Sequence, residues 1–259
     1  MGGIEARKLV GDKGWDQKKD AENLWYLEQY MFMPYGFFRF MQKLWPGNYR
    51  PTLSHYFIRT LQDKGMLLRQ WTENTDNLEK MCGIREEKLV EYMGTWMTFE
   101  CMNTDCRMEY NLDWIKDKLD SYQLPHCDNC YDKTRPAVLF WDEETPIEDN
   151  QASIDAANAD LIICLGTDLQ TMPFAKIPHM VPKDVPRLVI HDKEIEMDLD
   201  DWEMNVLFDF DSDLAYRDVF WEGSTDLAIL SLCSYLGKLN ESSPVIKSLS
   251  ILKLKISTN

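Results

Sequence analysis

Apolar positions along the chain follow two different rhythms. From residue 53 to residue 65 they recur every three to four positions, which predicts a helix that Thr52 or Ser54 caps. Later runs are short and apolar almost throughout, and they lie at 137–140, 160–165 and 187–190. Such runs, separated by helical segments such as 153–159, are typical of parallel strands with helices on both faces. The pattern therefore predicts an α/β fold.

Breaks in the apolar pattern predict the remaining elements. The aromatic-rich segment 22–44 is interrupted at Pro34, which predicts two short helices, and residues 45–48 predict a turn. We then expect a strand at 66–72, a loop at 73–76 and a helix at 77–81. A second strand is expected at 88–92, and an amphipathic helix at 216–237 closes the fold.

Composition limits the classes of partner. The chain has 259 residues, 44% of them hydrophobic, and a formal net charge of −16. Such an acidic protein has no electrostatic footprint for nucleic acid or an anionic membrane, so we expect neither as a partner. No apolar run reaches the length that a bilayer span needs. Free thiols would fit a reducing intracellular compartment: the cytoplasm, a cytoskeletal assembly or the nucleus.

Four of the seven cysteines have the spacing of a metal site. Cys101 and Cys106 are separated by four residues, and Cys127 and Cys130 by two. Four thiolates close a tetrahedral zinc site with no open position, so the predicted zinc is structural. We place it in a small module over residues 96–135. The remaining cysteines are expected to be buried free thiols, at Cys82, Cys164 and Cys233.

Several ordered motifs resemble those of the sirtuins, which are NAD-dependent protein-lysine deacylases. They are PGNYRPT at 46–52 followed by HYF at 55–57, TENTD at 72–76, LVEYMGT at 89–95, RPAV at 135–138, LGTDLQ at 165–170 and AYRDVFW at 215–221. The resemblance covers residues 30 to 238, and the cysteine spacing matches as well.

The resemblance implies a Rossmann-like domain over 22–95 and 136–238, interrupted by the zinc module. A polar arm over 1–21 and a tail over 239–259 would flank it. The sheet is expected to be incomplete at its N-terminal strand, because the family's glycine-rich phosphate loop and the strand before it have no counterpart in the sequence. The residues that the resemblance places at the cofactor are Asn74, Asp76, Gly166 and Thr167.

The departures from the family pattern fall on reactive positions. Met93 occupies the place of the general-base histidine, and a thioether cannot accept a proton near neutral pH. Asp168 replaces a serine that faces the dinucleotide, and a carboxylate there would repel phosphates. Trp141 replaces a glycine beside the acyl-lysine peptide and is expected to fill the space that the glycine leaves. Asn74 and Asp76 have an alternative interpretation as helix-capping residues.

These observations favour a degenerate sirtuin-fold protein without catalytic residues. It would bind structural zinc, would bind NAD poorly or not at all, and would serve as an interaction subunit for a protein partner. The alternative is an NAD-dependent protein-lysine deacylase with a rearranged N-terminus, or a sensor that binds NAD or ADP-ribose without turning it over.

Overall fold

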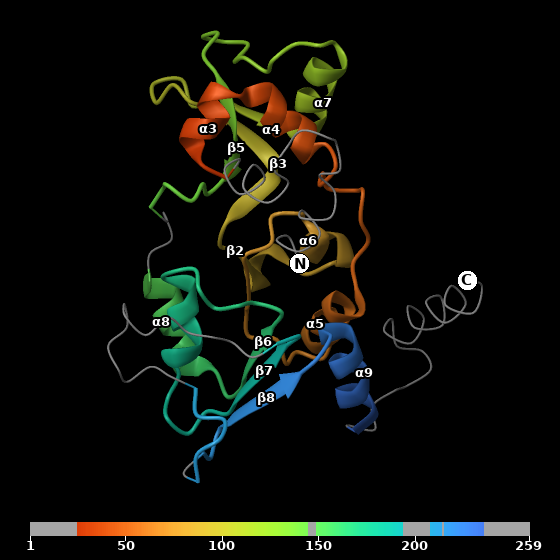
Figure 1. Cartoon of the computed structure of the whole chain (residues 1–259), viewed down its shortest axis with the longest axis vertical. Helices are drawn as coiled ribbons and strands as arrows, with labels where there is room; N and C mark the ends of the chain where they lie inside the picture. Colours follow the sequence, from red (N-terminus) through yellow and green to blue (C-terminus); the bar gives the residue numbers. More distant parts are fainter. Residues whose placement is uncertain (1–24, 145–148, 194–207, 214, 236–259) are drawn as a thin grey trace, which may run out of the picture. The chain divides into compact units, whose positions relative to one another are not determined.

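The computed structural model describes residues 25–144, 149–193, 208–213 and 215–235. The expected arm at 1–21 and tail at 239–259 lie outside the described residues. The chain divides into two compact units, each built from segments that are far apart in the sequence (Figure 1). Of the described residues, unit 1 comprises 25–50, Trp71–Met81 and 89–144, and unit 2 comprises Pro51–Gln70, Cys82–Lys88 and those from 149 onward.

An antiparallel sheet forms the centre of unit 1. Strand β3 (Gly94–Cys101) lies between β4 (Glu109–Asn111) and β5 (Thr134–Val138). Helix α7 (Leu112–Asp120) follows β4 directly, and the Asn111 side chain accepts a hydrogen bond from the Trp114 N–H at 2.9 Å to cap it. The strand predicted at 137–140 is displaced, because β5 starts three residues earlier and ends at Val138. The prediction that it is a parallel strand is wrong, because β5 pairs antiparallel with β3.

Two short helices complete the core of unit 1. Helices α3 (Leu27–Phe32) and α4 (Pro34–Met41) meet at Pro34, which starts the second one, so the predicted interruption is confirmed. Their buried rings pack against rings of the sheet, in a cluster that includes Tyr30, Phe37, Phe38, Trp96, Phe99 and Phe140. Each fully buried phenyl ring stabilises the unit by roughly 2 kcal/mol relative to an exposed one.

Short elements connect these segments. Helix α6 (Leu78–Cys82) follows β1 (Gln70–Thr72), which pairs with β2 (Leu89–Glu91) after the 3-10 turn η1 (Glu86–Lys88). The strand predicted over 66–72 is wrong for its first four residues. Gly65, with φ +70°, reverses the chain, and the N–H groups of Met66 and Leu67 donate to the Leu61 carbonyl to finish the preceding helix.

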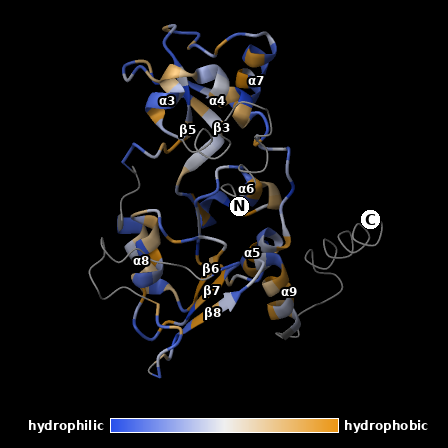
Figure 2. Cartoon of the chain, viewed as in Figure 1, coloured by the Kyte–Doolittle hydropathy of each residue, from blue (hydrophilic) through white to orange (hydrophobic). Residues whose placement is uncertain are grey.

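Unit 2 contains the parallel sheet that the apolar runs predict. Its strands are β6 (Ile162–Leu165), β7 (Arg187–His191) and β8 (Asp218–Glu222), paired in that order. Helices α5 (Leu53–Asp63) and α9 (Thr225–Tyr235) pack on one face, and α8 (Asp149–Asn158) and the 3-10 segment η2 (Phe174–His179) contribute to the other. Figure 2 shows how apolar β6 and β7 are. The α/β prediction is confirmed.

The prediction of a single helix over 216–237 is wrong at its beginning. Residues 218–222 form β8, Gly223 turns the chain at φ +140°, and only then does α9 start. The strand was missed because its first residue, Asp218, is polar yet buried, which gives the segment the look of one side of an amphipathic helix.

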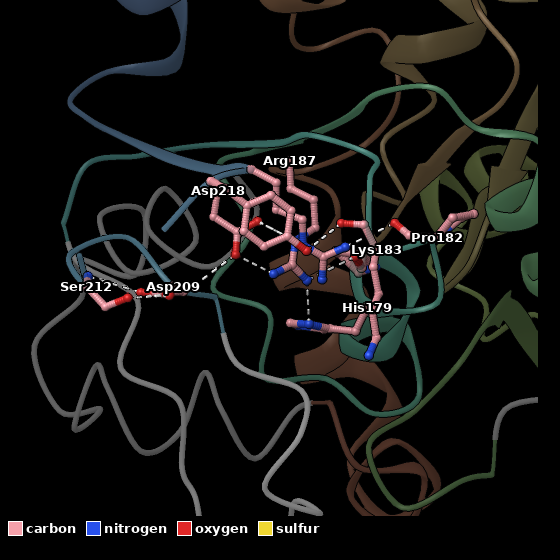
Figure 3. A network of polar contacts seen from close by, with 10 residues as sticks. His179, Pro182, Lys183, Arg187, Asp209, Ser212 and Asp218 are labelled. Atoms are coloured by element: carbon pink, nitrogen blue, oxygen red, sulfur yellow. Dashed lines mark hydrogen bonds and ion pairs between the residues drawn. The ribbon is translucent and has the colours of Figure 1, made fainter. Parts of the chain in front are cut away.

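A buried ion pair locks β7 to β8 at their N-terminal ends (Figure 3). Arg187 Nε donates to Asp218 Oδ1 at 2.6 Å, and a second bond joins Nη2 to Oδ2. On its other side Arg187 contacts His179 Nδ1 at 2.8 Å. Burial works against ionisation of Asp218, but hydrogen bonds from Arg187 and the Asp209 N–H hold its pKa below the ordinary carboxyl value. Burial, followed by the charge of Arg187, lowers the pKa of His179 to about 3.

The structure also tests the expectations for membrane spans and for the remaining thiols. Among the described residues there is no helix with the length and apolar character to cross a bilayer. Cys82 and Cys164 are buried thiols outside any disulfide, as predicted, whereas Cys233 is only partly buried on α9. Burial raises the pKa of the Cys164 thiol to about 12, which makes it unreactive.

Candidate functional site

The four predicted metal ligands converge on one point in unit 1. Cys101 ends β3, Cys106 lies in the loop to β4, and Cys127 and Cys130 lie in the turn before β5. All four sulfur atoms lie within 4.8 Å of one another. Tetrahedral zinc with Zn–S bonds of about 2.3 Å requires sulfur atoms about 3.8 Å apart, so this donor set fits zinc. Four thiolates leave no coordination position for substrate, and the site is structural.

Hydrogen bonds to the sulfur atoms support this site. Tyr110 Oη donates to Cys127 Sγ at 3.1 Å, and Asn129 Nδ2 donates to Cys106 Sγ at 3.3 Å. Burial raises the pKa of the Cys127 thiol, but the bonds from Tyr110 and from the N–H groups of Cys130 and Asn129 outweigh it and bring the pKa to about 6. Cys127 is thus ready to bind a metal as the thiolate.

Helix α7 holds the Cys127–Cys130 turn through a cluster that sequence analysis missed. The rings of Tyr110 and Trp114 stack with centroids 3.9 Å apart. Trp114 Nε1 donates to Asp128 Oδ2 at 2.8 Å, and Lys118 Nζ donates to Asp128 Oδ1 at 2.9 Å. Lys118, then Trp114, lowers the pKa of Asp128. The available signal was the four-residue spacing of Trp114 and Lys118, which places both on one side of a helical segment. Tyr110 lies on β4, and no local spacing predicts its stack on Trp114.

The loop between β1 and α6 carries two of the predicted cofactor residues, and they do different things. Asp76 Oδ1 accepts from the Leu78 N–H at 3.1 Å, so Asp76 caps α6 as the alternative interpretation states. Asn74 instead donates its Nδ2 to Glu79 Oε1 at 3.1 Å. Thr72 Oγ1 donates to the same oxygen at 2.7 Å. Glu79 was not singled out from sequence, because a glutamate in a helical segment is usually exposed.

Met93 lies in the turn between β2 and β3, with its side chain partly buried. Its carbonyl accepts from the Leu139 N–H at 2.9 Å. Gly94 allows this close approach, since a Cβ there would lie 2.1 Å from the Ala137 carbonyl oxygen and the backbone has φ +79°. The turn is therefore firmly placed, but its side chain has no basic atom.

Each of the four histidines is engaged in local structure. His55 completes the capping box of α5 with Thr52, and His179 contacts Arg187. His126 Nδ1 lies 3.1 Å from the Leu124 carbonyl in an exposed turn, and His191 Nδ1 lies 2.8 Å from the Lys193 carbonyl.

The other predicted cofactor residues lie at the carboxyl end of the parallel sheet in unit 2. Gly166 follows β6 with φ +63° and is exposed, and a Cβ on it would meet the Thr225 methyl at 3.4 Å, at the start of α9. In open parallel sheets this edge, next to a helix N-terminus, is where anionic ligands bind. Thr167 Oγ1 accepts from the Leu169 N–H. Asp168 is exposed, and its Oδ1 accepts from the Gln170 N–H at 3.3 Å.

The expectation for Trp141 is wrong, because its side chain is half-exposed at 52%. It contacts the Tyr26 ring edge-on, with centroids 5.6 Å apart. The following residues are built into unit 1: Asp142 Oδ1 accepts from the Leu27 N–H at the start of α3, and Glu143 pairs with Arg135. The loop therefore stabilises the N-terminal helices.

Comparison with known proteins agrees with these features. The sequence model of the Sir2 family matches residues 14–173. A zebrafish (Danio rerio) protein named NAD-dependent protein deacetylase sirtuin-2 is 35% identical over 230 residues, which cover 87% of this chain and 61% of the relative. A mouse (Mus musculus) NAD-dependent protein deacetylase sirtuin-3 is 40% identical over 158 residues, covering 61% of this chain and 47% of the relative. The chain thus spans about half to three fifths of the length of these relatives.

A solved structure described as the structural basis for sirtuin substrate affinity matches with a TM-score of 0.68. The two sequences are 22% identical, and the match covers 83% of this chain and 86% of the chain in that structure. This likeness shows the fold. A parallel α/β sheet and a four-cysteine cluster that fits zinc occur together in this chain. The chain belongs to the Sir2, or sirtuin, family.

Proposed function

We propose that this protein is an NAD-dependent protein-lysine deacylase whose turnover is limited by Met93. The observation that carries the proposal is the hydrogen-bonded cluster of Thr72, Asn74 and Glu79, in which Thr72 and Glu79 are buried and Asn74 is partly buried. Burying a carboxylate is costly unless donors surround it, so a chain that had lost any use for this loop would gain stability by replacing Glu79. The names of the zebrafish and mouse relatives support the same activity.

The residues would divide the work between binding and proton transfer. NAD, when bound, supplies the activated glycosidic bond at which the acyl oxygen of lysine reacts. Within unit 2, Gly166 and the start of α9 would bind phosphate groups, and within unit 1, Asn74 would bind a carboxamide. Met93 offers no proton acceptor, and loss of a general base costs about 10²–10⁴-fold in rate. We therefore expect NAD binding with slow turnover.

A second candidate function is that of an interaction subunit without turnover. Met93 at the base position favours it, as does the exposed aromatic pair Trp141 and Tyr26, which are 52% and 41% exposed. In this case a protein partner, and not a chemical step, would account for the presence of the four-cysteine centre.

The deciding experiment uses the full-length, zinc-loaded protein. Calorimetric titration with NAD and with ADP-ribose measures binding, and nicotinamide release with an acetyl-lysine peptide measures turnover. Met93→His should raise the rate at least about 10²-fold if the base is the limiting element, while Met93→Leu should leave it unchanged. Binding without any gain from Met93→His would contradict the limiting role of Met93. No heat at millimolar NAD would exclude the deacylase and leave the interaction subunit.

A further inference from the structure

Glu79 is the most deeply buried carboxylate described in unit 1, with 1% of its surface exposed. It lies on α6 and turns back toward the loop that precedes the helix. Its Oε1 atom accepts two hydrogen bonds, from Thr72 Oγ1 at 2.7 Å and from Asn74 Nδ2 at 3.1 Å. Thr72 Oγ1 in turn accepts from the Asn74 N–H at 3.1 Å. The backbone and the side chain of Asn74 are thus both fixed by the same pair of residues.

This arrangement determines which end of the Asn74 amide faces outward. A carboxylate oxygen accepts hydrogen bonds and cannot donate, so the NH₂ group of Asn74 must face Glu79. The amide oxygen then points away from the buried carboxylate, where it is an acceptor. A ligand that meets this oxygen must therefore bring an N–H or O–H donor.

The same loop is fixed from a second side by strand β3, which ends at Cys101. The Trp96 N–H donates to the Thr75 carbonyl at 3.2 Å, and Trp96 Nε1 donates to Thr75 Oγ1 at 2.6 Å. Trp96 is available for this because the register of β3 against β5 shifts between Thr95 and Phe99, which releases its N–H from the ladder. Asn74 therefore lies on a loop whose neighbouring residues on both sides are immobilised.

We propose that Glu79 is a positioning residue that presents the Asn74 amide oxygen to the carboxamide NH₂ group of a nicotinamide ring. The inference rests on the proposed function for its ligand class, while the orientation of Asn74 rests on the contacts alone. Glu79 does not touch the ligand; it acts through Asn74.

The test compares three variants of the full-length, zinc-loaded protein. Glu79→Gln keeps an oxygen that can accept both hydrogen bonds, Glu79→Leu removes the acceptor, and Thr72→Val removes one donor with little change in shape. Lys80→Ala is the control, because Lys80 is the next residue on α6 but pairs with Glu91 at 2.6 Å, outside the cluster. Hydrogen exchange of the Asn74 side-chain NH₂ group is followed by NMR, and nicotinamide affinity by titration.

We expect Glu79→Gln and Lys80→Ala to keep slow exchange at Asn74 and nicotinamide affinity within about threefold of the wild type. Glu79→Leu should speed the exchange and weaken nicotinamide about 10-fold, the usual scale for removing an orienting partner. Thr72→Val should fall between them, and it replaces Glu79→Leu if that variant does not fold.

Equal losses in Glu79→Gln and Glu79→Leu, or unchanged exchange in Glu79→Leu and Thr72→Val, would overturn the positioning role. Absence of nicotinamide binding in the wild type would overturn the ligand class and count against the proposed function. The exchange rates at Asn74 separate this outcome from a failure of the positioning role, because they do not depend on a ligand.

Discussion

Unit 1 gathers four cysteine thiols around one point, whereas unit 2 buries the Arg187–Asp218 ion pair between two strands. In unit 1 the sheet is antiparallel and β4 has only three residues. Because so few ladder hydrogen bonds hold β4, a metal bound to the four cysteines would supply much of the stability of this region. In unit 2 the strands are parallel and are covered on both faces by helical segments. The two units should therefore unfold under different conditions.

The comparison also applies to function. Unit 1 contains the turn with Met93, the Asn74 loop and the zinc centre, and β3 connects the first to the last. Unit 2 contains the sheet edge with Gly166 and Thr167. If the units unfold separately, the Asn74 loop in unit 1 and the Gly166 edge in unit 2 can each be disrupted without the other.

Zinc removal should have the largest effect, and it should be confined to unit 1. Structural zinc in small sites contributes about 10–16 kcal/mol of apparent binding free energy at neutral pH. A chelator, or Cys101→Ser, should therefore remove the hydrogen-exchange protection of β3 and β4 and leave that of β7 intact. Loss of protection in both units together would show that the comparison is wrong.

Asp218→Asn should have the next largest effect, in unit 2. It leaves the Arg187 charge buried without its partner, which typically costs about 3–5 kcal/mol of unfolding free energy. Urea denaturation followed at amides of β7 measures the loss. Asp63→Asn, which breaks the exposed pair with Arg59, is the matched control and should cost less than about 1 kcal/mol. The double variant Arg187→Met with Asp218→Leu should recover most of the loss, and failure to recover would mean that the charges themselves are not responsible.

Acid should weaken unit 2 earlier than ordinary carboxyl titration would. The folded pKa of His179, about 3, lies below its unfolded value of about 6.5, so the unfolded state binds the extra proton between these values. Stability should be full above about pH 6.5 and fall by up to about 1.4 kcal/mol per pH unit as the pH drops toward 4. Below about pH 4 protonation of Asp218, whose pKa is also lowered, adds to the loss. His179→Gln should flatten the upper part of this profile; an unchanged slope would assign it to other groups.

Tyr110→Phe should have the smallest effect, and it should be kinetic. The variant keeps the stack on Trp114 but loses the hydrogen bond to Cys127, so zinc should leave about 10-fold faster. A chromogenic chelator measures the release rate. Tyr122→Phe, at a side chain that is 91% exposed, is the control. Equal rates for Tyr110→Phe and the wild type would show that the metal centre does not depend on this donor.

The features that follow from local chemistry could be predicted from sequence. The cysteine spacing predicted the cluster of candidate metal ligands, and Pro34 predicted the break between α3 and α4. The sequence offered Thr52 or Ser54 as the cap of α5, and the structure has Thr52. Each depends on the geometry of a few consecutive residues, and tertiary contacts do not change it.

The features that depend on partners distant in sequence could not be predicted. Strand β8 begins with a polar residue that is buried only because Arg187 pairs with it from 31 residues away. Glu79 is buried because its two donors lie on a loop that has already turned back. Trp141 is exposed because Asp142, one residue on, is used at the start of α3, 115 residues earlier. A single sequence carries no signal for such pairings.

Strand β3 should not tolerate insertions or deletions. Its eight residues run from the turn beside Met93 to the ligand Cys101, and side chains alternate between the two faces of a strand. An insertion or deletion of one codon within 98–101 would send Phe99 to the solvent or the Cys101 thiol away from the other three. The exposed loop of Thr104 and Asp105 faces no such limit. We expect length differences among relatives to collect in that loop and between the two cysteine pairs, and to spare β3.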